Sequence, residues 1–307
     1  MERATKPGRV SRFRPRGLIG MSYILESIIS GLLLGLIYAL LSVGFGLTWG
    51  TMKILNIAHA VFAVLGAFLA YWIFVKVKLD PILSLPFLAA LMFLIGAVVY
   101  KLAVRPVTRA KDVVMASMVA TFGVATVVEN LMSYFWRPDP RVLKPVYSGS
   151  SLFIGDISIS VGPLIGCAIS LCSIALIYWF LHRTYTGKGV QATWQNPTGA
   201  ALAGINPERV SLITFGLSIA SAGAAGVAMA MVYAFYPAVQ SVWTLFVFLV
   251  TIVGGVGSVI GSALAGLLIG FIIGVSAAFL PFVWTNVILF ALLLIVLLFK
   301  PEGLFAT

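Results

Sequence analysis

Long apolar runs constrain this chain more than any other feature. Soluble domains carry roughly 25% charged residues, whereas this 307-residue sequence is 61% hydrophobic and only 9% charged, with a mean hydropathy of +1.09. Several runs reach the length of about 20 residues that a helix needs to cross the hydrocarbon core. We therefore predict an all-α, polytopic membrane helix bundle of about eight or nine spans. The apolar segments cover 24–48, 54–75, 83–103, 113–136, 161–181, 210–233, 244–279 and 283–299.

The formal net charge of +11 does not indicate nucleic acid as a partner. The basic residues concentrate in residues 1–20 and in the gaps between apolar runs, which is the pattern expected beside a lipid bilayer with anionic headgroups. The two histidines and two cysteines are scattered without ligand spacing, so we expect no metal site and no cofactor. No cluster with catalytic spacing is present, and we expect a transport protein rather than an enzyme.

Charge in the gaps gives a provisional orientation. The gap 101–111 is rich in lysine and arginine, which favours the cytoplasm. Alternation then places 76–82 and 137–160 outside and 182–209 inside. A cytoplasmic basic tail 1–20 conflicts with this scheme if both early segments cross fully. Either one early segment is re-entrant, or translation starts at Met21 and the tail is not native; we favour Met21. We treat 21–305 as a single transmembrane domain.

Two glycine-rich stretches, 44–59 and 254–266, interrupt the simple pattern of helices. Irregular backbone at membrane depth is tolerated only where protein or a water-filled cavity satisfies it, and transporters place such breaks at solute pathways. Close helix packing through small residues is the alternative explanation. We predict two broken or re-entrant segments that approach each other and line or gate the solute route. The candidate pathway residues are Asn56, His59, Glu129, Gly254, Gly255, Gly257 and Ser258.

Glu129 is included because an acid inside a membrane span is costly and is commonly functional. Asn56 and His59 are three residues apart and would share a helical face. A buried structural hydrogen bond explains Asn56 and His59 as readily as a role at a gate. Glu129 has a pathway or packing role in the bundle interior, or it reaches the end of its span or forms a local hydrogen bond.

The polar loop 183–209 contains two helix-start signals. Asn196 with Pro197 forms an N-cap and N1 pair, after which a short alanine-rich helix ends at Gly204. Asn206 with Pro207 starts the next span. A capped helix with small side chains at the cytoplasmic surface suits docking into another protein.

This loop resembles the cytoplasmic coupling loop of LivH-type branched-chain amino acid permeases, whose pattern is roughly G-x-x-x-R-A-x-A-x-N/D-x-x-A-A-x-x-x-G-I-x. Three further stretches resemble family motifs in the same order along the chain: residues 56–60 resemble N-F-A-H-G, residues 254–258 resemble G-G-x-G-S, and residues 300–305 resemble R-P-x-G-L-F. Two sites, three residues in all, differ from the family pattern. Gln191 replaces the arginine of the loop, and Ala60-Val61 stands where the family often has Gly-Glu.

The resemblance implies a membrane permease subunit of an ABC importer that moves branched-chain amino acids or related small polar solutes across the inner membrane. It implies a second permease subunit (LivM-like or a copy of this chain), two cytoplasmic ATPase subunits and a periplasmic solute-binding protein as partners. A secondary transporter driven by an ion gradient is the alternative. The residues that the resemblance assigns to ATPase coupling are Gly187, Lys188, Gln191, Ala192, Asn196, Ala200, Ala201 and Gly204.

Overall fold

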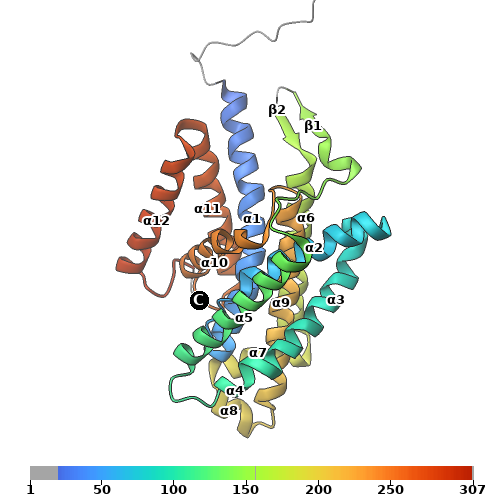
Figure 1. Cartoon of the computed structure of the whole chain (residues 1–307). Coiled ribbons are helices and arrows are strands. Elements are labelled where there is room, and N and C mark those ends of the chain that lie inside the picture. The colour runs from blue at the N-terminus through green and yellow to red at the C-terminus, as the bar shows by residue number, and fades with distance from the viewer. Residues whose placement is uncertain (1–19, 156, 306–307) are drawn as a thin grey trace, which may run out of the picture.

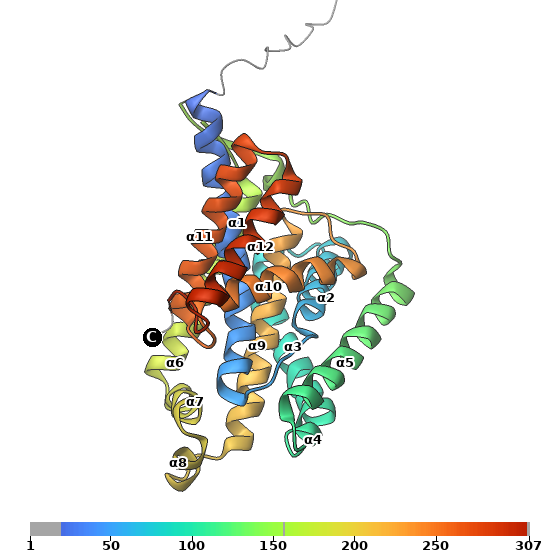
Figure 2. The same cartoon turned by 90° about the vertical axis from the view of Figure 1, so that its left-hand side faces the viewer.

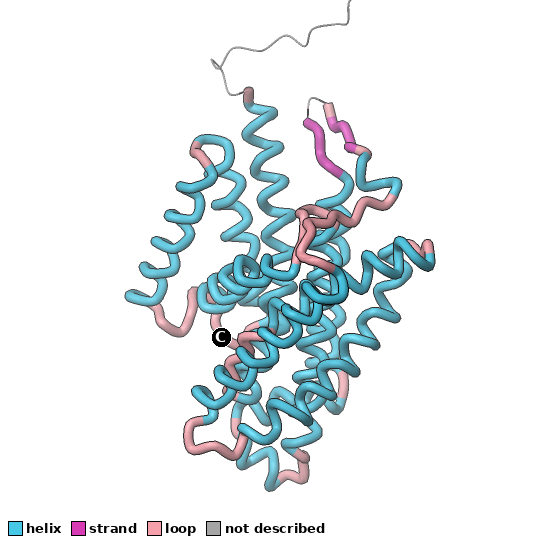
Figure 3. Tube along the Cα trace, viewed as in Figure 1, coloured by secondary structure: helices cyan, strands magenta, loops and turns pink. Residues whose placement is uncertain are grey.

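The chain folds as a bundle of tilted helices, seen in the computed structural model that describes residues 20–155 and 157–305 (Figures 1 and 3). Eight helices among these residues are long and apolar enough to cross a membrane, as the all-α prediction requires. The predicted basic tail lies outside the described residues except for Gly20.

The elements are α1 Met21–Met52, α2 His59–Trp72, η1 Ile73–Val77, α3 Pro81–Val99, η2 Tyr100–Val104, α4 Arg105–Val107, α5 Val113–Trp136, η3 Val146–Gly149, β1 Ser151–Ile154, β2 Ile157–Ser160, α6 Val161–Arg183, α7 Tyr185–Gln195, α8 Pro197–Leu202, α9 Pro207–Ala230, η4 Pro237–Val239, α10 Gln240–Gly254, α11 Val259–Phe279 and α12 Phe282–Phe299.

The sequence did not indicate the short antiparallel hairpin of β1 and β2, in which Ser151 pairs with Ser160 and Ile154 with Ile157. The glutamate near the start of α1, Glu26, accepts a hydrogen bond from the backbone N–H of Ser158. This contact fixes the hairpin beside the first turns of α1.

The centre of the bundle is formed by α1 and α9, which carry many of its fully buried residues. Glycines let α11 approach α1 closely. A Cβ atom added to Gly270 would lie 2.8 Å from Gly35 Cα and would also collide with the carbonyl oxygen of Gly31. In Figure 2, α5 lies on the opposite side of this central pair from α11.

Two contacts between distant loops show which gaps share an end of the bundle. Arg105 pairs with Glu208 at 2.9 Å, which joins the gap 101–111 to the polar loop 183–209. At the other end, Tyr147 donates a hydrogen bond to Asp80 Oδ1 at 3.0 Å. Burial, followed by this hydrogen bond, raises the pKa of the Tyr147 hydroxyl, which therefore stays protonated. These pairings agree with the predicted alternation, and Figure 1 shows α1 starting at the end opposite α8.

The interruptions do not coincide with the whole of the predicted glycine-rich stretches. Gly44, Gly46 and Gly50 lie inside α1, and the non-helical backbone occupies 53–58. The apolar run 244–279 divides into α10 and α11 around residues 255–258, while Gly261 and Gly266 lie within α11. Many of these glycines therefore serve helix packing, which was the alternative explanation.

Candidate transport pathway and coupling site

Two hydroxyl groups of α5 supply hydrogen bonds to the backbone of the first interruption, residues 53–58. The backbone N–H of Leu55 donates to Ser117 Oγ at 3.3 Å, and that of Ile57 donates to Thr121 Oγ1 at 3.1 Å. The Thr121 hydroxyl also has the Leu55 carbonyl oxygen within 3.2 Å. Because buried backbone groups must be paired, these two hydroxyls allow an irregular segment to lie inside the bundle.

Asn56 lies in the middle of this segment and is almost fully buried, with 1% of its surface exposed. Neither Oδ1 nor Nδ2 of its amide has a hydrogen-bond partner among the residues that the structure describes. A buried amide without partners costs about 1–3 kcal/mol. Such a group is a natural contact for water or a polar solute that enters this region.

His59 joins three helices. Its Nε2 lies 2.8 Å from the Leu41 carbonyl oxygen of α1, and its Nδ1 lies 3.3 Å from Ser218 Oγ of α9. The Nε2–H tautomer satisfies both contacts, with the Ser218 hydroxyl donating to Nδ1. His59 is therefore held as a structural cross-link at the start of α2.

The second interruption is a tight turn between α10 and α11. Gly255 and Gly257 have φ angles of +90° and +84°, a region that side chains with a Cβ atom disfavour. Ser258 then caps α11 by accepting from the backbone N–H of Gly261 at 2.9 Å. Gly254, the last residue of α10, packs against the backbone of Gly261.

The C-terminal residues pack on this turn. The backbone N–H of Leu304 donates to the Val253 carbonyl oxygen at 2.8 Å, and a Cβ atom on Gly303 would lie 2.5 Å from Gly255 Cα. Two sequence stretches that resemble family motifs, 254–258 and 300–305, thus meet in space.

A cavity of about 160 Å³ joins the second interruption to the polar loop. Its walls include Gly257 and Ser258 from the turn, Gln191 and Trp194 from α7, and Gly50 from α1. Asn56 and His59 are not among its lining residues. The two glycine-rich stretches do approach each other, because a Cβ atom on Gly50 would lie 3.0 Å from Gly257 Cα.

The polar loop folds into two helices, α7 and α8, of which the sequence indicated only α8. The predicted caps are present: Asn196 accepts from the Gly199 N–H at 2.9 Å, and Asn206 accepts from the N–H groups of Glu208 and Arg209. A third cap, Thr184, accepts from the Gly187 N–H at 3.0 Å and starts α7. Threonine is a favoured N-cap residue, and this residue type was the available signal for the start of α7.

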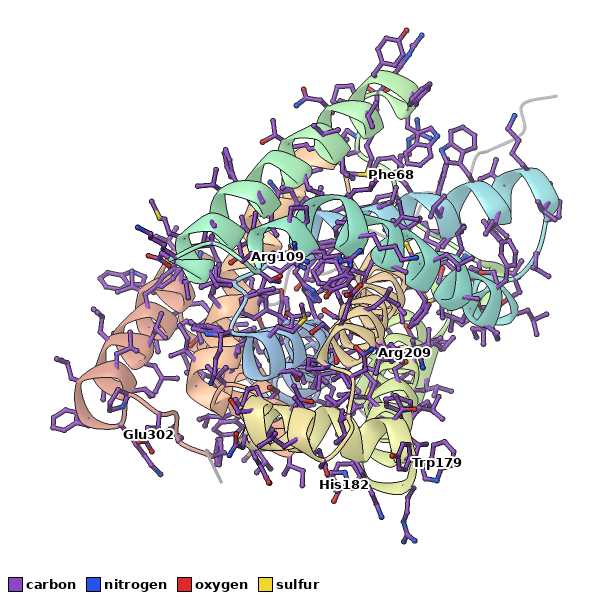
Figure 4. The ribbon with its side chains drawn as sticks, turned by 90° about the horizontal axis from the view of Figure 1, so that it is seen from below. Phe68, Arg109, Trp179, His182, Arg209 and Glu302 are labelled. Carbon is purple, nitrogen blue, oxygen red and sulfur yellow. The ribbon has the colours of Figure 1, made fainter. Side chains whose placement is uncertain are left out.

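The predicted coupling residues divide between a buried and an exposed face of this loop. Gly187 packs against the end of α6 and Ala200 is buried. Gln191 and Ala192 are half-buried, whereas the remaining four residues are exposed: Lys188, Asn196, Ala201 and Gly204. These four exposed residues can contact a partner protein. Figure 4 views the bundle from the end that carries α7 and α8.

Glu129 lies apart from both interruptions. Its Oε2 accepts a hydrogen bond from Gln240 Nε2 at 3.2 Å, so α5 is joined to the first residue of α10. The partner of this half-buried acid is a neutral amide. The structure does not bring Glu129 into the cavity beside Gly257.

Comparison with known proteins gives a consistent result. Residues 27–297 match the family described as "Branched-chain amino acid transport system / permease component". The high-affinity permease protein LivH of Salmonella typhimurium and that of Escherichia coli K12 are each 27% identical over 92% of this chain and 95% of their own length. BraD of Pseudomonas aeruginosa is 24% identical over 92% of this chain and 95% of its own length. No solved structure matches.

The matched family spans most of the helices described above, and its members are parts of ABC transporter systems. The apolar helices and the membrane-protein relatives together establish a multi-pass inner-membrane location. The chain belongs to the permease family of branched-chain amino acid ABC transporters and is a non-enzymatic transport subunit.

Proposed function

We propose that this chain imports branched-chain amino acids, or related small polar solutes, as one permease of an ATP-driven complex. The complex contains a second permease, two ATPase subunits and a periplasmic binding protein. The names of the relatives support the substrate class, since LivH and BraD are high-affinity branched-chain amino acid permeases. Related small polar solutes are included because Ala60-Val61 stands where the family often has Gly-Glu.

One observation carries the proposal: the loop that resembles a coupling loop lies directly against the glycine turn at 255–258. A Cβ atom on Gly257 would lie 2.7 Å from the indole of Trp194 in α7, and Gln191 lines the cavity beside this contact. A displacement of α7 by a bound ATPase would therefore reach the backbone turn between α10 and α11 without intermediate residues. Packed interiors transmit such displacements because they are nearly incompressible.

The solute route in this proposal runs along the two interruptions. At the first lies Asn56, whose amide has no hydrogen-bond partner within 20–155 and 157–305, and at the second lie Ser258 and the backbone of 254–257. Glu129 acts outside this route and holds α5 against α10 through Gln240.

The experiment that tests the coupling role is Ala201→Glu, on the exposed face of α8. A charged side chain at a packed protein contact should abolish ATPase binding, because an unpaired charge is expensive to bury. We expect normal membrane insertion, loss of ATPase co-purification, and leucine uptake reduced by about tenfold or more.

Ala238→Glu is the matched control, since Ala238 is an exposed alanine of η4, outside the polar loop. It should leave ATPase co-purification intact. Retained complex and retained transport in Ala201→Glu would remove α8 from the coupling mechanism.

A further inference from the structure

Trp194, near the end of α7, packs on the glycine turn between α10 and α11. A Cβ atom added to Gly257 would lie 2.7 Å from Trp194 Cζ2 and 3.0 Å from Cε2. On the neighbouring helix α1, a Cβ atom on Gly50 would lie 3.5 Å from Trp194 Nε1. The indole therefore lies over the point where α1 meets the turn.

Glycine at positions 50 and 257 creates the space for this ring. Any side chain at Gly257 would occupy the position of the indole, and its φ of +84° already disfavours one. A tryptophan has only two side-chain torsions and a large rigid ring, so it follows the backbone that carries it. Movement of α7 therefore displaces the ring relative to the turn.

The other end of α7 is fixed to α6. A Cβ atom on Gly187 would lie 2.6 Å from Leu181 Cα and would collide with the Phe180 carbonyl oxygen, so no side chain separates the two helices here. Thr184 caps α7 at this junction. Because its first turn is fixed, a displacement of α7 would fall mainly on its last turn, which bears Trp194.

We infer that Trp194 is the positioning residue that transmits movement of the polar loop to the glycine turn 255–258. The inference rests on the proposed ATP-driven import. With the ring in place the turn is held against Gly50, and withdrawal of the ring enlarges the cavity beside Ser258. The ring contributes to uptake through the position of the turn and makes no contact with ATP.

The test uses the whole complex in proteoliposomes, with leucine as the probe. Trp194→Ala should retain ATPase co-purification and ATP hydrolysis, while leucine uptake per ATP falls by about tenfold, the scale of residues that carry coupling energy. Trp194→Phe should restore most of the uptake because a ring still fills the space. Trp179→Ala is the control, since Trp179 is 58% exposed at the outer edge of α6 (Figure 4).

A second readout follows the turn itself. Ser258→Cys, in a background with both native cysteines replaced by serine, reports access to the cavity for a membrane-impermeant thiol reagent. Trapping the ATPases with nucleotide should change its labelling rate, and Trp194→Ala should make labelling fast and independent of nucleotide. Should Trp194→Ala fail to insert, Trp194→Leu keeps apolar volume without the ring and is measured in the same two assays.

Wild-type uptake per ATP in Trp194→Ala, or nucleotide-dependent labelling that persists without the ring, would overturn the inference. Equal losses of uptake and ATP hydrolysis, unrescued by phenylalanine, would also overturn it. A wild-type complex that shows no ATP-driven uptake would instead contradict the proposed function. The two failures are therefore distinguishable.

Discussion

Side-chain hydroxyl groups form hydrogen bonds with the backbone at the first interruption of the bundle. Ser117 and Thr121, one turn apart on α5, bind the backbone of Leu55 and Ile57. The sequence predicted an irregular segment but could not identify these partners, because the contacts join residues more than sixty positions apart. His59 shows the same limit, since its partners lie on α1 and α9.

Thr121→Val tests the contribution of these hydroxyls. The change keeps the shape of the side chain and leaves the Ile57 N–H unpaired, so the protein should lose about 1–2 kcal/mol of stability. Thermal unfolding of the purified protein in detergent measures the loss. Thr126→Val on the same helix is the control, because the Thr126 hydroxyl donates to the Phe122 carbonyl oxygen of its own helix. Equal unfolding temperatures for both variants would show that α5 does not support the segment.

Elements of the bundle are positioned by glycine contacts. Gly31 and Gly35 of α1 meet Gly266, Gly270 and Gly274 of α11, backbone against backbone. From sequence, glycines that pack helices and glycines that break them look alike, since both uses need a small residue. This is why Gly44 to Gly50 were included in a predicted break and lie within α1 instead. The caps at Asn196 and Asn206 were predictable because their partners are two or three residues away.

Gly270→Ala should separate α1 from α11. The added methyl group meets the backbone of Gly31 and Gly35, which cannot rotate away, and overpacking of this kind costs about 1–3 kcal/mol or more. We expect a lower yield of monodisperse protein by size-exclusion chromatography. In Gly123→Ala the new methyl group on α5 meets no atom within 4 Å, so this variant should behave as the wild type. Identical behaviour of the two variants would contradict close packing of α1 and α11.

Across the whole molecule, the fold class and the family could be predicted from sequence, because apolar runs and ordered motifs are local signals. The meeting of α7 with the turn 255–258 could not, since it joins distant segments through Trp194, a residue in a polar loop that no motif singled out. The molecule therefore connects an exposed polar surface at one end to an interruption inside the bundle.

A secondary transporter driven by an ion gradient would need paired charges inside the membrane. The half-buried acid Glu129 has the neutral Gln240 as its partner.

The central claim is ATP-driven import, and uptake of radiolabelled leucine by the reconstituted complex tests it most directly. The ATPases and ATP are enclosed in the vesicles, the binding protein is added outside, and each component is omitted in turn. We predict uptake only when ATP and the binding protein are both present, and none in response to a proton or sodium gradient alone. Uptake by the permease without ATPases, driven by an ion gradient, would contradict the account.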